Sequence, residues 1–345
     1  MGVRGSSLLV AAAATAVAAF MPGAATHRQS PGGHRTPLGL HRGPTQSNDS
    51  TTSLPEWQWT AAHEDGVPAW VQAAAANVTI AVVDTGADLS VPSLAGKVSA
   101  TWNVTTDSTA VSDTVGHGTF VASLAAGSTP SSLRGFGGDA KLMIVQANRG
   151  TGFSDVDEAN AITWATDHGA NIINLSLGGT QSSAVEQEAV QYAIGKGVLL
   201  VAAAGNAALA GNPKVYPGAA IGRSGLVVGA ADAGGARASF SETGSYVDLL
   251  APGVNVLGAL APDGSSGLFA PATVAGYGYG SGTSYAAPEV AGAAALVMAA
   301  NPTLTAAQVA QTLEQTASGR GVWTAGRAFG DVNVGAAVAR ALGER

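Results

Sequence analysis

Four polar residues of the chain are of types that carry acyl-transfer chemistry, and each follows or precedes an apolar segment. Asp84 follows the run VTIAVV, His117 stands within Gly-His-Gly-Thr, and Ser284 stands within Gly-Thr-Ser-Tyr-Ala-Ala-Pro. A serine hydroxyl becomes a nucleophile when a histidine accepts its proton and a carboxylate orients that histidine. Asn206, in Ala-Ala-Gly-Asn, can donate its amide N–H to the oxyanion that such a reaction forms.

Each of these residues also has an ordinary structural role. An Asp at the end of a strand and a Ser ahead of a helix commonly serve as caps, and Asn after Gly is a common turn pair. A Ser at a helix N-terminus nevertheless has backbone N–H groups and positive potential beside it, which suits an oxyanion. Pro288 falls in the first turn of the helix that we expect after Ser284, where its missing N–H has no intrahelical partner.

The elements that must position these side chains alternate along the chain. Apolar runs predict strands at 78–83, 142–145, 172–175, 198–202, 226–228 and 247–250. Helical patterns are expected at 118–126, 156–167, 184–194, 284–300, 305–316 and 332–341. This order predicts an α/β fold, a doubly wound and mostly parallel sheet flanked by helices, with the site at the carboxyl ends of the strands.

Composition excludes several classes of protein. The 345 residues are 46% hydrophobic and 11% charged, which is typical of a globular chain with a sizeable core. The net charge of −7 provides no basic surface for nucleic acid, so we expect no nucleic-acid partner. The absence of Cys removes disulfides and thiolate nucleophiles. No Gly-x-Gly-x-x-Gly follows the first predicted strand, which argues against a flavin or nicotinamide enzyme.

The N-terminal region indicates export. One positive charge, an apolar stretch at 7–21 and the small residues of 22–25 have the layout of a signal peptide, assigned here to residues 1–25. A membrane anchor is the alternative, but the stretch is shorter than the roughly 20 residues that span a bilayer. Residues 26–55 read as a disordered linker or short pro-segment and 56–345 as the folded domain. We expect a secreted, extracellular monomer with no membrane association after signal removal.

The motifs taken together resemble those of the subtilisin-like serine peptidases, the subtilase family (peptidase family S8). Asp-Thr-Gly at Asp84, His-Gly-Thr at His117 and Gly-Thr-Ser-x-Ala-x-Pro at Ser284 occur in the family's order, with Asn206 between the last two. The resemblance extends from about residue 57 to 341 and implies a three-layer subtilisin-like fold. It also implies a serine endopeptidase with a triad of Asp84, His117 and Ser284, an oxyanion donor in Asn206 and an acyl-enzyme intermediate.

The resemblance also implies a set of substrate-binding segments. Ser176-Leu177-Gly178 and Gly150-Thr151-Gly152 match the two segments between which an extended peptide lies as an added strand. Ala203, Ala204 and Gly205 match the walls of the first specificity pocket. Val215 stands where many relatives have Gly at the pocket floor, so we expect a shortened pocket that favours small or medium apolar residues over large aromatics.

Departures from the family pattern carry further expectations. Phe120 and Glu289 replace residues that are often His, and Tyr285 replaces a frequent Met beside the nucleophile, which predicts resistance to mild peroxide. The usual calcium segment lacks acidic ligands, so no cofactor is required and no metal residue is assigned. A weak structural calcium at Asp155, Asp157 or Asp232 is possible, although solvated surface charges are the expected reading.

Two alternatives to a secreted protease follow from the same chain. The Gly-rich stretch 262–280 precedes the nucleophile and is the place to look for an insertion that occludes the site, which would leave a catalytically silent scaffold that binds peptides. The short segment between the signal and the domain is compatible with a mycosin-like processing protease. The absence of a spanning helix at the carboxyl end and of cysteines ranks that assignment lower.

Overall fold

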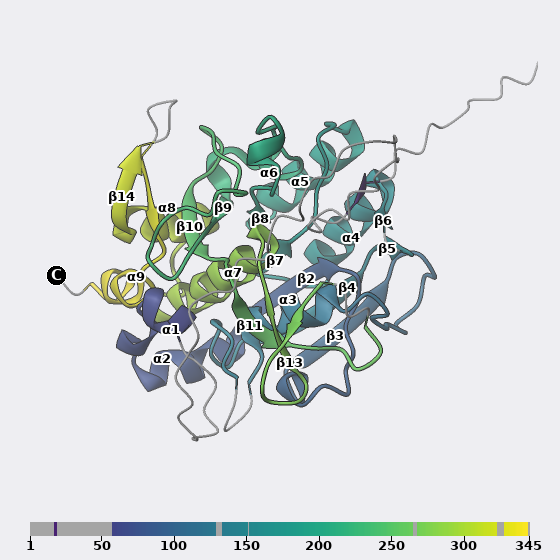
Figure 1. Cartoon of the computed structure of the whole chain (residues 1–345), viewed down its shortest axis with the longest axis horizontal. Helices are drawn as coiled ribbons and strands as arrows, with labels where there is room; N and C mark the ends of the chain where they lie inside the picture. Colours follow the sequence, from purple (N-terminus) through teal and green to yellow (C-terminus); the bar gives the residue numbers. More distant parts are fainter. Residues whose placement is uncertain are drawn as a thin grey trace, which may run out of the picture.

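The computed structural model describes residues 17–18, 57–128, 133–150, 152–264, 268–322 and 328–343. The predicted signal peptide and linker therefore lie outside the described residues, except for β1 (Val17–Ala18). Nine strands of the described chain form one sheet in the order β14-β15-β10-β9-β8-β7-β2-β4-β3 (Figure 1). All neighbours in it are parallel except β14 and β15, which confirms the predicted mostly parallel sheet.

The predicted strands and helices all occur, and no boundary is shifted by more than three residues. The strands of the large sheet are β2 (Thr79–Asp84), β3 (Val98–Asn103), β4 (Lys141–Gln146), β7 (Ile172–Leu175), β8 (Leu199–Ala203), β9 (Leu226–Ala231), β10 (Leu249–Pro252), β14 (Ser318–Val322) and β15 (Ala328–Asp331). The long helices are α3 (His117–Ala126), α4 (Asp155–Asp167), α5 (Ala184–Gly195), α7 (Thr283–Ala300), α8 (Ala306–Thr316) and α9 (Val334–Ala341).

Several elements are absent from the sequence prediction. They are α1 (Trp57–Ala61), α2 (Ala69–Ala74), α6 (Gly218–Ile221), the strand β3, the β14 and β15 pair, and two small antiparallel sheets. One sheet is β1-β6-β5, with β5 (Asn148–Arg149) and β6 (Gly152–Phe153). The other is β11-β13-β12, with β11 (Val256–Ala259), β12 (Ala270–Pro271) and β13 (Tyr277–Gly280). These elements are too short or too polar for apolar periodicity to reveal them.

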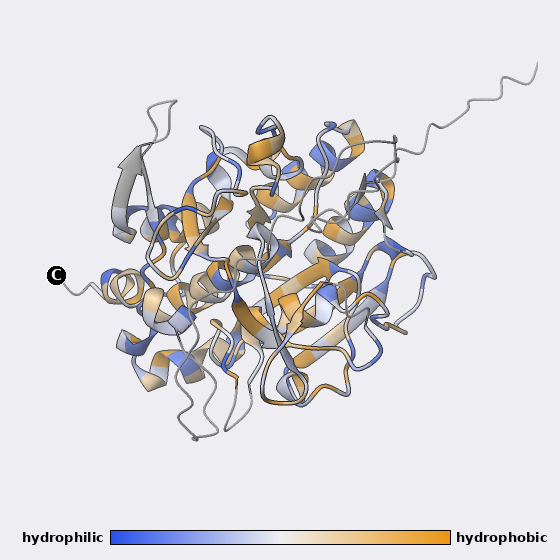
Figure 2. Cartoon of the chain, in the orientation of Figure 1, coloured by the Kyte–Doolittle hydropathy of each residue, from blue (hydrophilic) through white to orange (hydrophobic). Residues whose placement is uncertain are grey.

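Helices cover both faces of the sheet. Alternate residues of each central strand point to opposite faces, and both sets are apolar, so each face needs helices to bury it. Ile80 and Val82 of β2 belong to one apolar cluster with α3 and α7, whereas Ala81 and Val83 belong to a second cluster with α4 and α5. In Figure 2 the central strands are mostly orange and the outer helix faces carry the blue. The result is the predicted three-layer arrangement, with α3 and α7 packed side by side on one face.

The helix that carries Ser284 begins one residue earlier than predicted. Helix α7 starts at Thr283, so Pro288 is its sixth residue and lies inside the helix rather than in the first turn. A proline at this position lacks the N–H that would bond to the carbonyl four residues before it, which is that of Ser284. The expected placement of Pro288 was therefore wrong, and the carbonyl of Ser284 needs another donor.

Candidate active site

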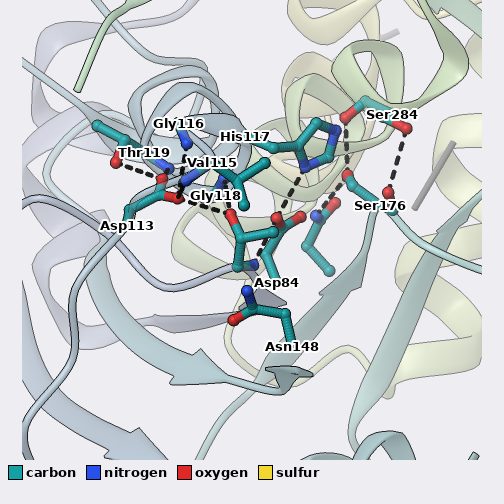
Figure 3. Close-up of polar contacts among 12 residues, drawn as sticks. Asp84, Asp113, Val115, Gly116, His117, Gly118, Thr119, Asn148, Ser176 and Ser284 are labelled. Atoms are coloured by element: carbon teal, nitrogen blue, oxygen red, sulfur yellow. Dashed lines mark hydrogen bonds and ion pairs between the residues drawn. The ribbon is translucent and has the colours of Figure 1, made fainter. Parts of the chain in front are cut away.

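Strand β2 and helix α3 bring Asp84 and His117 into direct contact. Asp84 is the last residue of β2, and His117 is the first residue of α3. His117 Nδ1 lies 2.7 Å from Asp84 Oδ1, and both side chains are 1% exposed (Figure 3). Asp84 Oδ1 also accepts from the Thr85 backbone N–H at 2.7 Å. A carboxylate at this nitrogen requires the N–H on Nδ1 and leaves the lone pair on Nε2.

Two opposing influences set the charge of the histidine. Burial lowers the pKa of His117, but the Asp84 carboxylate, through its charge and its hydrogen bond, and the Asp113 charge raise it. The net result is a pKa above the ordinary value of 6.5. Such an imidazole is a stronger base than a free one, and it is stabilised when it becomes an imidazolium.

Asp113 fixes the loop that carries His117, and the sequence reasoning missed it. Its Oδ1 accepts from the N–H of Gly116 at 2.7 Å and from that of Val115 at 3.2 Å. Its Oδ2 accepts from the N–H and hydroxyl of Thr119 at 2.8 and 2.6 Å. Together these bonds cap the N-terminus of α3 from within the protein. An Asp a few residues before an apolar helix is the sequence signal that would have found it.

The side chain of Thr85 connects the end of β2 to the start of α3. Its hydroxyl accepts from the Gly118 N–H at 2.8 Å and donates to Asp113 Oδ1 at 2.9 Å. A side chain on Gly118 would place its Cβ 2.1 Å from the Gly86 carbonyl oxygen, so this close approach requires glycine. The glycines of the Asp-Thr-Gly and His-Gly-Thr motifs thus bring the end of β2 and the start of α3 together.

Ser284 lies on the other side of the His117 ring, as Figure 3 shows. It is buried and belongs to the first turn of α7. Its Oγ donates to the Ser176 carbonyl at 3.1 Å, and within the described chain His117 Nε2 has no hydrogen-bond partner. In sites without substrate such serine–histidine bonds are often long, so this geometry does not exclude a catalytic role.

Asn206 is held beside Ser284 by Thr283, the residue that precedes Ser284 in the chain. Its Oδ1 accepts from the Thr283 N–H at 2.9 Å and from the Thr283 hydroxyl at 3.0 Å. These bonds identify Oδ1 as the acceptor end of the amide and leave Nδ2 as its donor end. The structure therefore brings Asp84, His117, Asn206 and Ser284 together from four separate segments.

Two of the segments predicted to bind substrate lie close to Ser284 or to one another. Ser176 directly follows β7, and its hydroxyl donates to the Ser284 carbonyl at 2.7 Å. Leu177 is buried, and the backbone of Gly179, just after Gly178, pairs with that of Tyr216 through two bonds of 2.8 Å. This pairing sets the 176–178 segment beside Val215.

The pocket-wall residues Ala203, Ala204 and Gly205 follow one another at the end of β8 and are buried. Val215 is 1% exposed, and its Cγ2 lies 2.7 Å from the position that a Cβ on Gly205 would take. Val215 therefore lies near both the 176–178 segment and Gly205. Their role in binding stays a prediction.

The opposing segment is an antiparallel hairpin. Gly150 has φ +64° and joins β5 to β6, which begins at Gly152, and Thr151 is outside the described residues. The outer edge of β6 pairs antiparallel with β1, Val17 facing Phe153 and Ala18 facing Gly152. An extended segment of the chain itself therefore occupies this edge.

The stretch proposed as an occluding insertion packs beside the histidine loop. Phe269 stacks on Phe120 with ring centres 4.4 Å apart, and both rings contact Tyr285. A cavity of about 410 Å³ lies between this stretch and Gly116, the residue before His117. Residues 265–267 lie outside the described chain.

The acidic residues considered for calcium do not all behave as expected. Asp157 is 3% exposed and accepts two hydrogen bonds from Arg149, at 2.6 and 2.9 Å, so its reading as a solvated surface charge was wrong. Burial opposes its ionisation, but the bonds from Arg149 and Ser154 hold the pKa of Asp157 below its usual range. Within the described residues, no three His, Cys, Asp or Glu side chains gather as a metal site would require.

Comparisons with known proteins find chains of similar sequence and similar fold. The subtilase family model matches residues 75–339. Subtilisin E of Bacillus subtilis strain 168 is 37% identical over 250 residues, which are 70% of this chain and 61% of that protein. Fervidolysin of Fervidobacterium pennivorans, a keratinolytic enzyme related to subtilisin, superposes with a TM-score of 0.71 at 32% identity, covering 82% of this chain and 45% of that one. The MycP3 protease of a type VII secretion system superposes with a TM-score of 0.67 at 30% identity, covering 82% and 88%.

The chain belongs to the subtilase family. It spans less than two thirds of the length of subtilisin E and of fervidolysin. No helix in the described part of the chain combines the length and apolar character needed to cross a bilayer.

Proposed function

We propose that the protein is a secreted serine endopeptidase that hydrolyses peptide bonds through an acyl-enzyme. The observation that carries this proposal is the placement of the His117 ring between Asp84 and Ser284. Its Nδ1 lies 2.7 Å from Asp84, and its other side faces Ser284 (Figure 3). Family membership supports the same conclusion. The other properties are those expected from the sequence: polypeptide substrates, a monomer, and no required cofactor, with a weak structural calcium allowed.

Each residue has a distinct role in the reaction. Ser284 Oγ attacks the scissile carbonyl while His117 Nε2 takes its proton, and Asp84 keeps the Nδ1 proton in place and stabilises the imidazolium. The oxyanion accepts hydrogen bonds from the Asn206 amide and the Ser284 backbone N–H, which has no intrahelical partner so near the start of α7. His117 then protonates the leaving amine, and water repeats the sequence to release the acyl group.

The substrate is an extended polypeptide that adds a strand between the 150–152 and 176–178 segments. The pairing of β1 with β6 supports this mode of binding. Backbone hydrogen bonds give affinity without sequence preference, so selectivity comes from the pocket whose floor is Val215. Its branched side chain favours small or medium apolar residues before the scissile bond.

A silent or occluded scaffold is the second candidate. The burial of Ser284 and the hydrogen bond that its Oγ gives to Ser176 rather than to His117 favour it. In that case the protein would bind peptides without cleaving them. The contact of the 262–280 stretch with Gly116 and Phe120 is where occlusion would arise.

A fluorophosphonate probe distinguishes the two candidates, because labelling requires an activated Ser284 and an open site. The proposal predicts labelling of the wild type and none of Ser284→Ala. Casein digestion should fall about a million-fold in Ser284→Ala and about 100 to 1000-fold in Asn206→Ala. A folded wild type that neither labels nor digests casein would establish the scaffold instead.

A further inference from the structure

Glu242 contacts the backbone on both sides of Asn206. It is 0% exposed and lies between β9 and β10, far from Asn206 in the sequence. Its backbone N–H donates to the Gly205 carbonyl at 3.0 Å, and its Oε1 accepts from the Ala207 N–H at 3.2 Å. One residue therefore fixes the peptide groups before and after the proposed oxyanion donor.

The carboxyl group packs directly against this loop. Gly205 has φ +112°, and a Cβ there would lie 2.6 Å from both Cδ and Oε2 of Glu242. The left-handed backbone and the missing side chain are both needed for this approach. The loop that presents Asn206 and the carboxyl group of Glu242 thus fit one another closely enough that neither can move alone.

A tyrosine orients the second oxygen of the carboxylate. Tyr246 Oη lies 3.1 Å from Glu242 Oε2, and also 3.3 Å from the Ala204 carbonyl and 3.4 Å from that of Pro213. The single hydroxyl proton goes to the carboxylate, which is the strongest and nearest acceptor. No cation in the described chain forms an ion pair with Glu242.

The same environment sets the ionisation of Glu242. Burial raises its pKa, and the hydrogen bonds from Tyr246 and Ala207 limit the rise to about 6. Burial and the nearby Glu242 in turn raise the pKa of Tyr246. Above about pH 6, therefore, Glu242 offers two acceptor oxygens to a hydroxyl and an N–H.

The side chain of Asn206 is held independently from the other direction. Thr283, the residue before the nucleophile, donates both its N–H and its hydroxyl to Asn206 Oδ1. Thr283 fixes the rotation of the amide, and its hydroxyl also accepts from the Gly205 N–H at 3.1 Å, on the chain just before Asn206. Glu242 instead holds the two peptide groups that flank Asn206, through the Gly205 carbonyl and the Ala207 N–H.

We propose that Glu242 is a positioning residue for catalysis, which holds the Gly205–Ala207 backbone so that Asn206 meets the developing oxyanion. This inference rests on the proposed peptidase function. A small displacement of such a donor loses transition-state stabilisation without loss of substrate binding. Glu242 should therefore affect kcat much more than KM.

The first test is a double-mutant cycle on kcat with a peptide substrate. Glu242→Ala should lower kcat about 10 to 100-fold, with KM changed less than about twofold. In an Asn206→Ala background the same change should lower kcat less than about twofold, because the donor that Glu242 positions is already gone. The exposed Glu188→Ala serves as the matched control and should leave kcat unchanged. An equal loss in both backgrounds would overturn the proposal.

The second test uses Glu242→Gln, which has the shape of the protonated acid and keeps an acceptor for Ala207. Its kcat at pH 8 should be about threefold below that of the wild type, and the ratio should approach one as the pH falls below about 6. Tyr246→Phe should reproduce the defect of Glu242→Gln at pH 8. A ratio that is constant with pH contradicts a role for the carboxylate.

Two measurements separate this inference from its premises. Turnover and probe labelling by the wild type test the peptidase function before any Glu242 variant is made. Thermal unfolding of each variant identifies a folding defect, and if Glu242→Ala does not fold, Glu242→Gln and Tyr246→Phe decide the question by the pH dependence of their kcat.

Discussion

Ser176 and Ser284 exchange a reciprocal pair of hydrogen bonds. Ser284 Oγ donates to the Ser176 carbonyl at 3.1 Å, and Ser176 Oγ donates to the Ser284 carbonyl at 2.7 Å. The second bond exists because Pro288, four residues after Ser284, has no N–H to offer that carbonyl. Because Pro288 has no N–H, the Ser284 carbonyl accepts from Ser176 instead, and this bond connects α7 to the segment after β7.

This relationship predicts the effect of Ser176→Ala on stability. The substitution leaves the buried Ser284 carbonyl without its donor, which should cost about 1 to 3 kcal/mol of unfolding free energy. Urea unfolding in a Ser284→Ala background, where self-digestion is absent, measures the cost. Pro288→Ala restores an N–H to the helix, so the cost of Ser176→Ala should shrink in that variant. A cost that is independent of residue 288 would contradict this account.

Two buried carboxyl groups predict a loss of stability as the pH rises. Burial raises the pKa of Glu64 to about 7, with Arg134 opposing and Asp65 adding to the rise. Burial and the nearby Glu64 raise the pKa of Glu289 well above 4.5. Above pH 4.5 the unfolded chain releases protons that these two carboxyl groups retain in the folded state. Their contribution to the free energy of unfolding is therefore fully present below pH 4.5 and is lost as the pH rises through the raised pKa values.

Glu64→Gln isolates this effect. Its unfolding free energy relative to the wild type should increase by on the order of 3 kcal/mol between pH 4.5 and 7. Glu289→Gln should change in the same direction, and the exposed Glu188→Gln should show no trend. Urea unfolding at several pH values provides the difference curves, and flat curves for both buried sites would refute the assignment.

The main sheet could be predicted because its central strands are buried on both faces and therefore read as continuous apolar runs. The motif residues could be predicted because each of them follows or precedes such an element. Asp113 was missed although its place just before an apolar helix is a capping signal. Glu242 could not be identified from the sequence, because its importance lies in hydrogen bonds to the backbone of residues far away in the chain. The small sheet β11-β13-β12 escaped prediction because its strands are antiparallel and short, and β11 and β13 contain Gly.

The position of Val215 predicts the selectivity of the first pocket. Its side chain is 1% exposed and packs against Gly205. Val215→Gly should raise kcat/KM for substrates with Phe before the scissile bond about tenfold relative to those with Ala. Cleavage of a peptide library by both forms measures the ratio. A wild-type profile dominated by Phe or Tyr would refute the proposed shortening of the pocket.

Tyr285 predicts resistance to peroxide. It follows the nucleophile, is 1% exposed and packs against Phe120 and His117, with ring centres 4.8 and 5.6 Å away. A Met at this position would be oxidised to a polar sulfoxide within this aromatic cluster, whereas a phenol ring resists mild peroxide. Tyr285→Met should therefore lose most of its activity during a treatment that leaves the wild type nearly unchanged. Tyr285→Phe, which keeps the ring, should behave as the wild type does. Equal inactivation of the wild type and Tyr285→Met would show that the sensitive group lies elsewhere in the chain.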